Sequence, residues 1–413
     1  MLFLTKLAFK NLARHRNRTV ITAMIIALAV FIYIFYDSLL SGMTVMSYGT
    51  LIDYETGHLQ VVNRAYWDEE EKLPLKNLLT VDETLQSQLR NVRGFVAASP
   101  ELNFQARLNN GWDELPVMGK GIEPEAFKGV FALEDQLVAG EMFAAGEHRA
   151  VLGKRLADLL DLTVGDYITM QVKDKNKGFN TLEVEIAGLV HTSNPNVNQN
   201  IVYVPLDLAQ EALAVEGQVS KVILRLAGQD RAAGAAAELE RSLKKHDPDL
   251  AAYPWNQLEA FAFFGAVELE KQVILAIILL IAAIAIINTV ILAALERMGE
   301  IGMMKALGLQ KKEVVYTFVM ESTGIGLLGG SIGILLGMLL VWFLAKYGID
   351  FGALVGIEMS AFGLPVLGKI YGVWNPQGML EVFAFGVGIS FLASLWPAYW
   401  AAGKDPVKAI DHH

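Results

Sequence analysis

Cysteine is absent from this 413-residue sequence. Its absence excludes disulfide bonds, thiol nucleophiles and cysteine-based zinc sites. It says little about the cellular compartment, because a large exported domain with an ample hydrophobic core needs no disulfide bonds.

Motifs for nucleotide binding and catalysis are missing as well. The nearest approach to the P-loop pattern G-x-x-x-x-G-K-[ST] lies around Gly153 and Lys154. It lacks the first glycine and has Arg155 where Ser or Thr is required. There is no H-E-x-x-H or G-x-S-x-G motif, and the seven histidines are scattered. We therefore predict no enzymatic activity, no metal site and no cofactor bound by this chain.

The sequence contains fewer basic residues than acidic residues, 34 Lys and Arg against 44 Asp and Glu. The formal net charge is -10, and residues 43–267 hold 20 Lys and Arg against 32 Asp and Glu. An acidic domain of this size is a poor nucleic-acid binder, because that binding depends on neutralising phosphates.

Apolar residues make up 53% of the sequence, and only 19% of residues are charged, against ~25% in ordinary soluble domains. They concentrate in four stretches. In the second stretch, 273–295 contains 23 residues without a charge, about 35 Å of helix and enough to cross a ~30 Å hydrocarbon core. The predicted transmembrane helices are 19–42, 271–295, 314–345 and 380–400. A signal peptide competes for the first stretch, but that stretch is too long and no A-x-A-like site follows it.

Basic residues predict the orientation in the membrane. Residues 1–18 carry five basic side chains and no acid, and Lys311 and Lys312 contribute to a basic loop at 296–313. The positive-inside rule places both termini and this loop in the cytoplasm, with 43–270 and 346–379 outside. Residues 1–18 are predicted to be an amphipathic helix on the inner surface, or simply a charged flank. The tail covers 401–413, where His412 and His413 are either native or a tag remnant.

The outer segment 43–270 has a strand–helix–strand pattern at each end. Thr80 is predicted to cap a helix at 81–90, and Asp230 to cap one at 231–245. We predict a four-helix membrane protein with a large α+β extracytoplasmic domain. Its two parts are one subdomain from 50–103 and 216–260 and an inserted β-rich subdomain, 104–215. The polar segment 191–200 is predicted to be a solvated hairpin, with a contact loop as the alternative.

Small and polar residues stand out within the apolar stretches. Glycines in the third stretch follow two small-x-x-x-small registers, which predict close helix packing. Those glycines are Gly326, Gly329, Gly330, Gly333 and Gly337. Glu321, Asn288 and Asp37 are costly in a membrane unless paired or near its surface. We interpret them as residues that bond neighbouring helices, with a hinge or relay as the alternative for Glu321. Pro397 is predicted to end or kink the fourth helix.

Four motifs, distributed from one end of the chain to the other, resemble those of the MacB/FtsX-type permeases of ABC transporters. They are KLAFKNLARHRNRTVITAMIIALAV at the start, GKRLADLLDLTVGDYIT, ERMGEIGMMKALG after the second stretch, and WPAYWAAGKDPVKAI near the end. A separate permease of this size, with a large outer domain in a porter-plus-insert arrangement and no ATPase on the same sequence, most resembles the lipoprotein-releasing LolC/LolE subgroup. No counterpart of that subgroup's protruding carrier-binding loop stands out.

The resemblance implies partners and site residues. ATP and Mg²⁺ would bind to a cytoplasmic ABC ATPase on a separate chain, and a second permease would complete a homo- or heterodimer. The ATPase-coupling residues would be Glu296, Arg297, Glu300, Ile301, Gly302, Lys305, Ala306, Leu307 and Gly308. Candidate contacts for a lipid cargo, equally explained as membrane-interface anchors, are Tyr33, Phe35, Tyr36, Phe261, Phe263 and Phe264.

The resemblance also implies a function in the bacterial inner membrane. ATP-driven movement would be transmitted mechanically to the outer domain and would release lipoproteins towards the outer membrane, with membrane lipids and a periplasmic lipoprotein carrier as further partners. One alternative is an FtsX-like regulator of periplasmic cell-wall hydrolases. The other is a MacB-like subunit that exports drugs, peptides or lipids.

Overall fold

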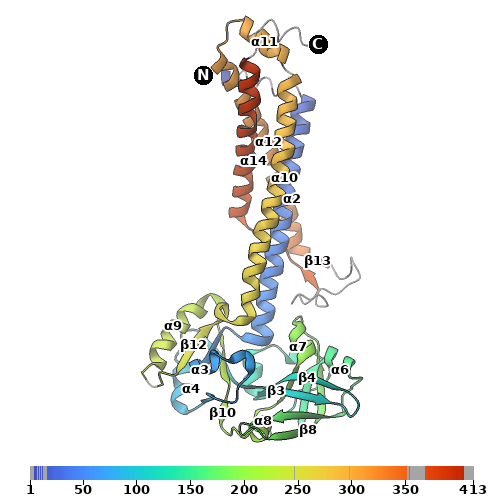
Figure 1. The fold of residues 1–413 in the computed structure, drawn as a ribbon, viewed down its shortest axis with the longest axis vertical. Coiled ribbons are helices and arrows are strands. Elements are labelled where there is room, and N and C mark those ends of the chain that lie inside the picture. The colour runs from blue at the N-terminus through green and yellow to red at the C-terminus, as the bar shows by residue number, and fades with distance from the viewer. Residues whose placement is uncertain are drawn as a thin grey trace. The chain divides into compact units, whose positions relative to one another are not determined.

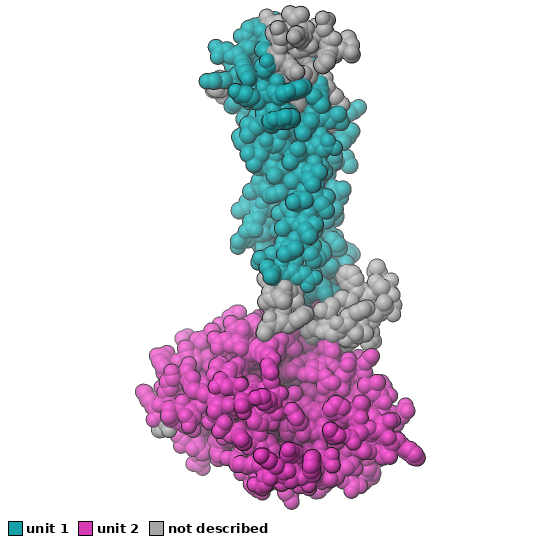
Figure 2. Space-filling model, viewed as in Figure 1, with its two compact units in different colours: residues 1–44, 266–350, 369–413 teal, residues 45–265, 351–368 magenta. Residues whose placement is uncertain are grey.

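The computed structural model describes residues 16–245, 247–296, 298–350 and 368–403, together with residues 4–6, 8, 10, 12 and 353. The chain divides into two compact units (Figure 2). The helical unit comprises 1–44, 266–350 and 369–413, and the α+β unit comprises 45–265 and 351–368. Arg297, His412 and His413 lie outside the described residues.

Long helices dominate the helical unit (Figure 1). They are α2 (Arg16–Leu51), α10 (Ala262–Glu296), α12 (Lys311–Tyr347) and α14 (Pro376–Gly403), with the short α11 (Met298–Ala306) between α10 and α12. A two-stranded ribbon pairs β13 (Ile349–Asp350) with β14 (Lys369–Ile370). Helix α14 continues through Pro397 to Gly403, so this proline does not end it.

In the described part of the chain, four helices are long and apolar enough to span a membrane, at Thr19–Thr56, Leu269–Leu292, Lys311–Tyr347 and Pro376–Trp400. The predicted four-span class is thereby confirmed. Ile26 and Val30 of α2 are buried in the bundle core with Ile286 of α10 and Val382 of α14. Leucines on other faces remain exposed, for example Leu339, as expected for surfaces in contact with lipid tails.

The α+β unit is built on a mixed sheet with the strand order β12-β1-β11-β3-β4-β9-β6-β8-β5, and β7 pairs with β3 and β8. The strands are β1 (Leu59–Asn63), β3 (Phe95–Asn109), β4 (Glu114–Ile122), β5 (Leu137–Gly140), β6 (Arg149–Gly153), β7 (Tyr167–Lys173), β8 (Phe179–Val190), β9 (Ile201–Pro205), β11 (Lys221–Leu226) and β12 (Leu250–Pro254). A separate ribbon pairs β2 (Leu79–Thr80) with β10 (Gln218–Val219).

Short helices accompany the sheet. They are α3 (Arg64–Trp67), α4 (Glu83–Arg90), α5 (Pro124–Val130), α6 (Lys154–Leu159), α7 (Pro195–Asn200), α8 (Leu206–Leu213) and α9 (Ala232–Leu243). A π-helical turn, η1 (Ile52–Thr56), directly follows α2, and η2 (Glu70–Lys72) is a 3-10 turn. The main core includes Leu59, Leu102, Leu108 and Leu152, all fully buried on the central strands.

Strand β3 pairs with three other strands of the sheet. Its first part pairs with β11, and its last residues pair with β7, while β4 runs antiparallel along much of its length. Strands β1, β11 and β12, which come from opposite ends of the outer segment, are neighbours. The expected subdomain boundary at 103/104 therefore falls within one 15-residue strand.

Three local predictions were wrong. Asp82, not Thr80, caps α4, and its carboxylate accepts from the Leu85 N–H at 2.7 Å. Thr80 is instead the last residue of strand β2, where it pairs with Gln218 of β10. Asp230 lies within a preceding 3-10 turn, so α9 begins at Ala232 without a side-chain cap.

The third wrong prediction is the solvated hairpin at 191–200. Thr192, Asn194 and Asn198 are at most 3% exposed, and α7 forms within this segment. Asn198 exchanges hydrogen bonds with Thr192, and the amides of Asn194 and Asn196 donate to the two oxygens of Glu55 at 2.6 and 2.8 Å. Asn194 and Asn198 can be buried because Glu55 and Thr192 satisfy their side-chain amides.

Candidate functional site

Within the expected ATPase-coupling segment, Glu296 ends α10, and residues 298–308 form α11 and the turn that follows it. Gly308 has φ +94°, a left-handed conformation that glycine adopts without strain. Its N–H bonds to the Lys305 carbonyl, and the Leu309 N–H reaches the Met304 carbonyl. These bonds satisfy the last carbonyls of α11, as in the glycine-ended helix termini of other proteins. Gly308 therefore sets the direction of the chain between α11 and α12.

Capping at the start of α12 completes this turn. The side chains of Gln310 and Glu313 form a capping box, in which the Gln310 N–H donates to Glu313 Oε2 at 2.8 Å. Leu307 lies on the turn between the two caps and is 82% exposed. The turn therefore exposes an apolar side chain at a fixed position between the ends of two helices.

The other coupling residues have different environments. Lys305 donates to the Ala402 carbonyl near the end of α14 at 3.1 Å, so it ties α11 to the bundle. Glu300 and Gly302 lie on α11, and Glu300 has a bonding partner. Helical backbone is described at Glu296, Ile301 and Ala306, but their side chains lie outside the described part.

The glycines of α12 lie at two intrachain contacts. A Cβ on Gly329, Gly333 or Gly337 would meet α2 atoms of Ala23, Ala27, Val30 or Ile34 at 2.5–2.7 Å. On Gly326 and Gly330 it would meet Ser390 and Phe383 of α14 at 2.8 Å. The two registers thus allow α12 to approach two neighbours in the same chain, where backbone packing holds membrane helices together.

Three polar residues meet within the helical unit. Asp37 of α2 forms an ion pair with Lys271 of α10, and Asn375, just before α14, donates to the same carboxylate. Lys271 also donates to Ser41 Oγ on α2 at 2.9 Å. Asn375 in turn accepts the Gly378 N–H in the first turn of α14. Asp37 therefore joins three elements of the bundle.

Sequence reasoning singled out Asp37 but missed its partners. Lys271 was missed because it lies at the edge of the second apolar stretch, where a lysine ordinarily marks the end of a transmembrane helix. Glu321 is 3% exposed and also has an interaction partner. Lys271, which lies two residues before a 23-residue uncharged run, was a signal for pairing with an intramembrane acid.

The aromatic residues expected to contact a lipid cargo fall into three groups. Tyr33 is buried in the core of the helical unit, and Phe261 packs against Tyr48 and Trp255 in the α+β unit. Phe35 and Tyr36 keep partial exposure on α2. The side chains of Phe263 and Phe264 lie outside the described residues.

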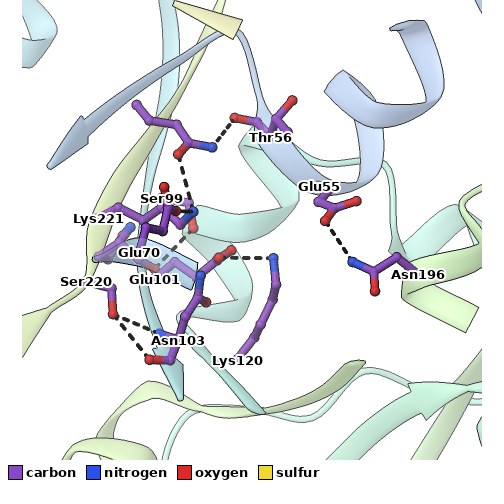
Figure 3. A network of polar contacts seen from close by, with 12 residues as sticks. Glu55, Thr56, Glu70, Ser99, Glu101, Asn103, Lys120, Asn196, Ser220 and Lys221 are labelled. Carbon is purple, nitrogen blue, oxygen red and sulfur yellow. Dashed lines mark hydrogen bonds and ion pairs between the residues drawn. The ribbon is translucent and has the colours of Figure 1, made fainter. Parts of the chain in front are cut away.

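A charged network crosses the centre of the large sheet (Figure 3). Glu101 on β3 lies opposite Lys221 on β11, and Asn103, two residues on, lies opposite Lys120 on β4. The period-2 alternation of strands places these side chains on one face. The distance from Lys120 Nζ to Glu101 Oε1 is 3.0 Å, with side chains 4% and 0% exposed.

Lys221 extends the network to β1 and η2. Its ammonium donates to Glu70 Oε1 at 2.7 Å and to Gln60 Oε1 at 3.3 Å, and Gln60 donates to the Thr56 carbonyl. Burial lowers the pKa of Lys221, but the carboxylates of Glu70 and Glu101 outweigh it and hold this pKa above its ordinary value. Lys221 is therefore a permanent cation that links η1, η2 and three strands.

This network is structural in its chemistry. Its lysines are matched to carboxylates, and a small cavity of about 170 Å³ adjoins it. Among the described residues, no group of three or more His, Cys, Asp or Glu is arranged to hold a metal ion. Sequence reasoning missed this network, because the alternation of a strand does not reveal which charged residues face each other across strands.

Comparisons with known proteins cover most of the chain. Residues 19–242 match the model of the MacB-like periplasmic core domain, and residues 272–406 match that of the FtsX-like permease C-terminal region. The lipoprotein-releasing system transmembrane protein LolC of Neisseria meningitidis serogroup B is 25% identical over 330 residues. The alignment covers 78% of this chain and 79% of that protein.

Two further proteins are similar. LolE of Haemophilus influenzae, also called a lipoprotein-releasing system transmembrane protein, is 25% identical over 349 residues, with 80% of this chain and 81% of LolE covered. The crystal structure of the periplasmic region of MacB from Actinobacillus actinomycetemcomitans aligns at 12% identity with a TM-score of 0.35. That alignment covers 50% of this chain and 92% of the MacB region.

Proposed function

The chain belongs to the MacB/FtsX-type permeases of ABC transporters, and on this premise we propose that it releases lipoproteins from the bacterial inner membrane as part of an ATP-driven complex. It is a permease subunit, and its sequence holds no P-loop for ATP hydrolysis. A cytoplasmic ATPase would supply the energy, and a second permease would pair with this one.

One observation carries the mechanical part of the proposal. Helices α2 and α10 have 36 and 35 residues, about 54 and 52 Å at ~1.5 Å per residue. Both exceed the ~30 Å hydrocarbon core by roughly 20 Å. The boundary between the two units falls inside each of these helices, at 44/45 and 265/266. Unbroken helices of this length are suited to carrying a displacement out of the membrane.

The proposed orientation in the membrane is based on the distribution of charge. Basic residues at the N-terminus and around Lys311 and Lys312 favour a cytoplasmic location for both termini and for α11. The exposed Leu307 turn would then face the ATPase. Movement of α11 would pass through α10 to α2, because the Lys271 contacts with Asp37 and Ser41 connect the two helices.

The cargo is proposed from the relatives. Two proteins with lipoprotein release in their names align over about four fifths of this chain. A lipoprotein is held in the bilayer by acyl chains, and each buried CH₂ contributes ~0.8 kcal/mol. Withdrawing two or three such chains costs tens of kcal/mol, which requires a driven machine. Phe35 and Tyr36, partly exposed on α2, are the candidate contacts for those chains.

The test is native mass spectrometry of the chain in nanodiscs with its native ATPase and any co-encoded permease. We expect a bound acylated polypeptide that leaves on addition of ATP and stays with ADP. Mixing in an ATPase variant without its catalytic glutamate should also retain the cargo. A complex that never holds an acylated polypeptide, yet hydrolyses ATP when a periplasmic protein is added, would overturn lipoprotein release in favour of a regulatory role.

A further inference from the structure

The side-chain amide of Asn288 on α10 makes no hydrogen bond to any described residue of the chain. Sequence reasoning expected it to bond a neighbouring helix, as it did for Asp37 and Glu321. Those two carboxylates do have interaction partners. Asn288 is instead exposed on the surface of the helical unit, so its hydrogen-bonding capacity is directed away from its own chain.

The depth of Asn288 in the apolar stretch makes this exposure costly. It lies within the uncharged run 273–295, eight residues before Glu296. At ~1.5 Å per residue, about 12 Å of helix separate it from that first charge, farther than an asparagine side chain reaches. Its amide can donate two hydrogen bonds and accept two, whereas lipid tails offer no partner. A partner outside this chain is therefore needed at this depth.

Helix α10 has two different faces. One packs within the chain, through the buried residues Leu275, Ala282, Ile286 and Val290. At about 3.6 residues per turn, Asn288 lies roughly half a turn around the helix from Ile286. Asn288 therefore lies on the face opposite the one that packs in the bundle.

A heptad stripe runs along this exposed face. Its members are spaced alternately by four and three residues and are Ile277, Ile281, Ile284, Asn288, Ile291 and Leu295. Ile281 and Ile284 are 61% and 60% exposed, and Ile291 is partly exposed. This is the spacing of the core positions of a two-helix coiled coil. In such cores, one asparagine among β-branched residues specifies the register and the number of helices.

A second copy of this chain matches the stripe. Two copies inserted with the same orientation have parallel α10 helices, and a twofold axis along the membrane normal brings the same residue of each copy to the same depth. The two Asn288 amides then meet, and each satisfies the other because an amide both donates and accepts. A partner of different sequence would need its own polar residue at this depth.

We propose that two copies of this chain pair through α10, with their Asn288 side chains hydrogen-bonded to each other across the twofold axis. The inference rests on the pairing of two permeases in the proposed function, and it does not depend on the cargo.

Disulfide cross-linking tests the contact, because the chain has no cysteine of its own. Two differently tagged copies of the full chain are produced together with the native ATPase, each with Ile284→Cys, about one turn before Asn288. Oxidation in the membrane should join the two tags. The matched control is Leu339→Cys, which is also exposed, at 69%, but lies on α12. It should give much less of the joined product.

A second measurement addresses Asn288 itself. Energy transfer between labelled copies in liposomes, followed as lipid is added, gives the dissociation constant of the pair. Asn288→Val should raise this constant at least about fivefold, as expected for one interhelical hydrogen bond in a membrane. Asn288→Gln keeps the amide and should recover most of the association. The thermal midpoint of the fully diluted chain should not change, since Asn288 has no partner among the described residues.

Thr289→Val is the matched control for Asn288→Val. The Thr289 hydroxyl donates to the Ala285 carbonyl of its own helix at 2.8 Å, so it needs no second copy. Its removal should leave the dissociation constant within about twofold.

Three results would overturn the inference. Absence of an Ile284→Cys disulfide would show that this face of α10 contacts lipid. A disulfide formed only with a permease of different sequence would exclude the second copy as the partner. Equal effects of Asn288→Val and Thr289→Val would remove the role of the amide. A chain that pairs through α10 but holds no acylated polypeptide would contradict lipoprotein release and leave this inference standing.

Discussion

The carboxylate of Asp37 lies 3.0 Å from the ammonium of Lys271, and this contact joins α2 to α10, two helices that each contain a boundary between the units. The side chains are 7% and 13% exposed. A charge inside a membrane bundle is costly unless it is paired. The pair therefore stabilises one relative position of α2 and α10, and Asn375 extends this restraint to α14.

Removing Lys271 tests this restraint. Lys271→Met should lower the free energy of unfolding by about 3 kcal/mol, because it leaves a buried carboxylate without its cation. Adding Asp37→Asn should recover much of that loss, since the pair then disappears together. Thermal unfolding of the chain in nanodiscs measures both. If the two losses are simply additive, Asp37 and Lys271 do not interact in the membrane.

The glycine contacts make a different prediction about helix packing. A Cβ at Gly333 would lie 2.7 Å from the Ala27 carbonyl oxygen, a backbone atom that cannot move aside alone. Gly333→Leu should therefore separate α12 from α2 and lower the thermal midpoint of the chain by several degrees even without a partner. Gly388→Leu on α14 is the control, because no atom lies within 4 Å of a Cβ there. Equal tolerance of both changes would show that α12 does not pack on α2 in the bilayer.

The spans and their glycine registers could be predicted because hydropathy and four-residue spacing are local properties of a sequence. The helix that each glycine register contacts could not be predicted. Gly329 and Gly326 are only three residues apart, but Gly329 contacts α2 and Gly326 contacts α14. The neighbours of Glu101 could not be predicted for the same reason. Lys120 comes from β4 and Lys221 from β11, and the order of the strands depends on the whole sheet.

The polar composition of residues 191–200 led to a wrong prediction. Residues 191–200 contain four asparagines and one proline, a composition typical of solvated turns. In the fold, the side-chain amide groups of Asn194 and Asn196 both bond to Glu55, which is 139 residues away from Asn194. A sequence does not reveal that a distant carboxylate will satisfy buried amides.

The buried imidazole of His58 predicts a pH dependence of stability. Burial lowers its pKa and the Arg225 cation adds to this effect, although Asp53 opposes it. Nδ1 accepts the Leu226 N–H at 3.0 Å, so the neutral ring is the form that fits. Because the folded pKa is below the unfolded value of about 6.5, stability is complete above that value and falls as the pH drops through and below it.

The expected result is a thermal midpoint that decreases between pH 7 and pH 5. His58→Asn keeps an acceptor near the Leu226 N–H but does not titrate, so its midpoint should change less across this range. Carboxylates elsewhere contribute equally to both proteins and cancel in the comparison. Identical slopes for the wild type and His58→Asn would mean that the imidazole is not held neutral in the fold.

Substitutions at Gly308 and Leu307 can test whether the turn acts through its backbone conformation or through a direct contact with the ATPase. No atom lies within 4 Å of a Cβ placed there, so a side chain meets no steric obstacle, but its φ of +94° is strained for most residues. Gly308→Val should impose a penalty of about 1–3 kcal/mol on this conformation and redirect Leu307. Asparagine tolerates left-handed backbone better than other non-glycine residues, so Gly308→Asn should be much milder.

The readout is stimulation of the partner ATPase by the purified permease in nanodiscs. We expect Gly308→Val to reduce stimulation about tenfold and Gly308→Asn to retain most of it, with the thermal midpoint of the α+β unit unchanged in both. Leu307→Ala, which removes the exposed side chain but not the turn, should also reduce stimulation if this turn contacts the ATPase. Full stimulation by Gly308→Val and Leu307→Ala would place the ATPase contact elsewhere on the chain.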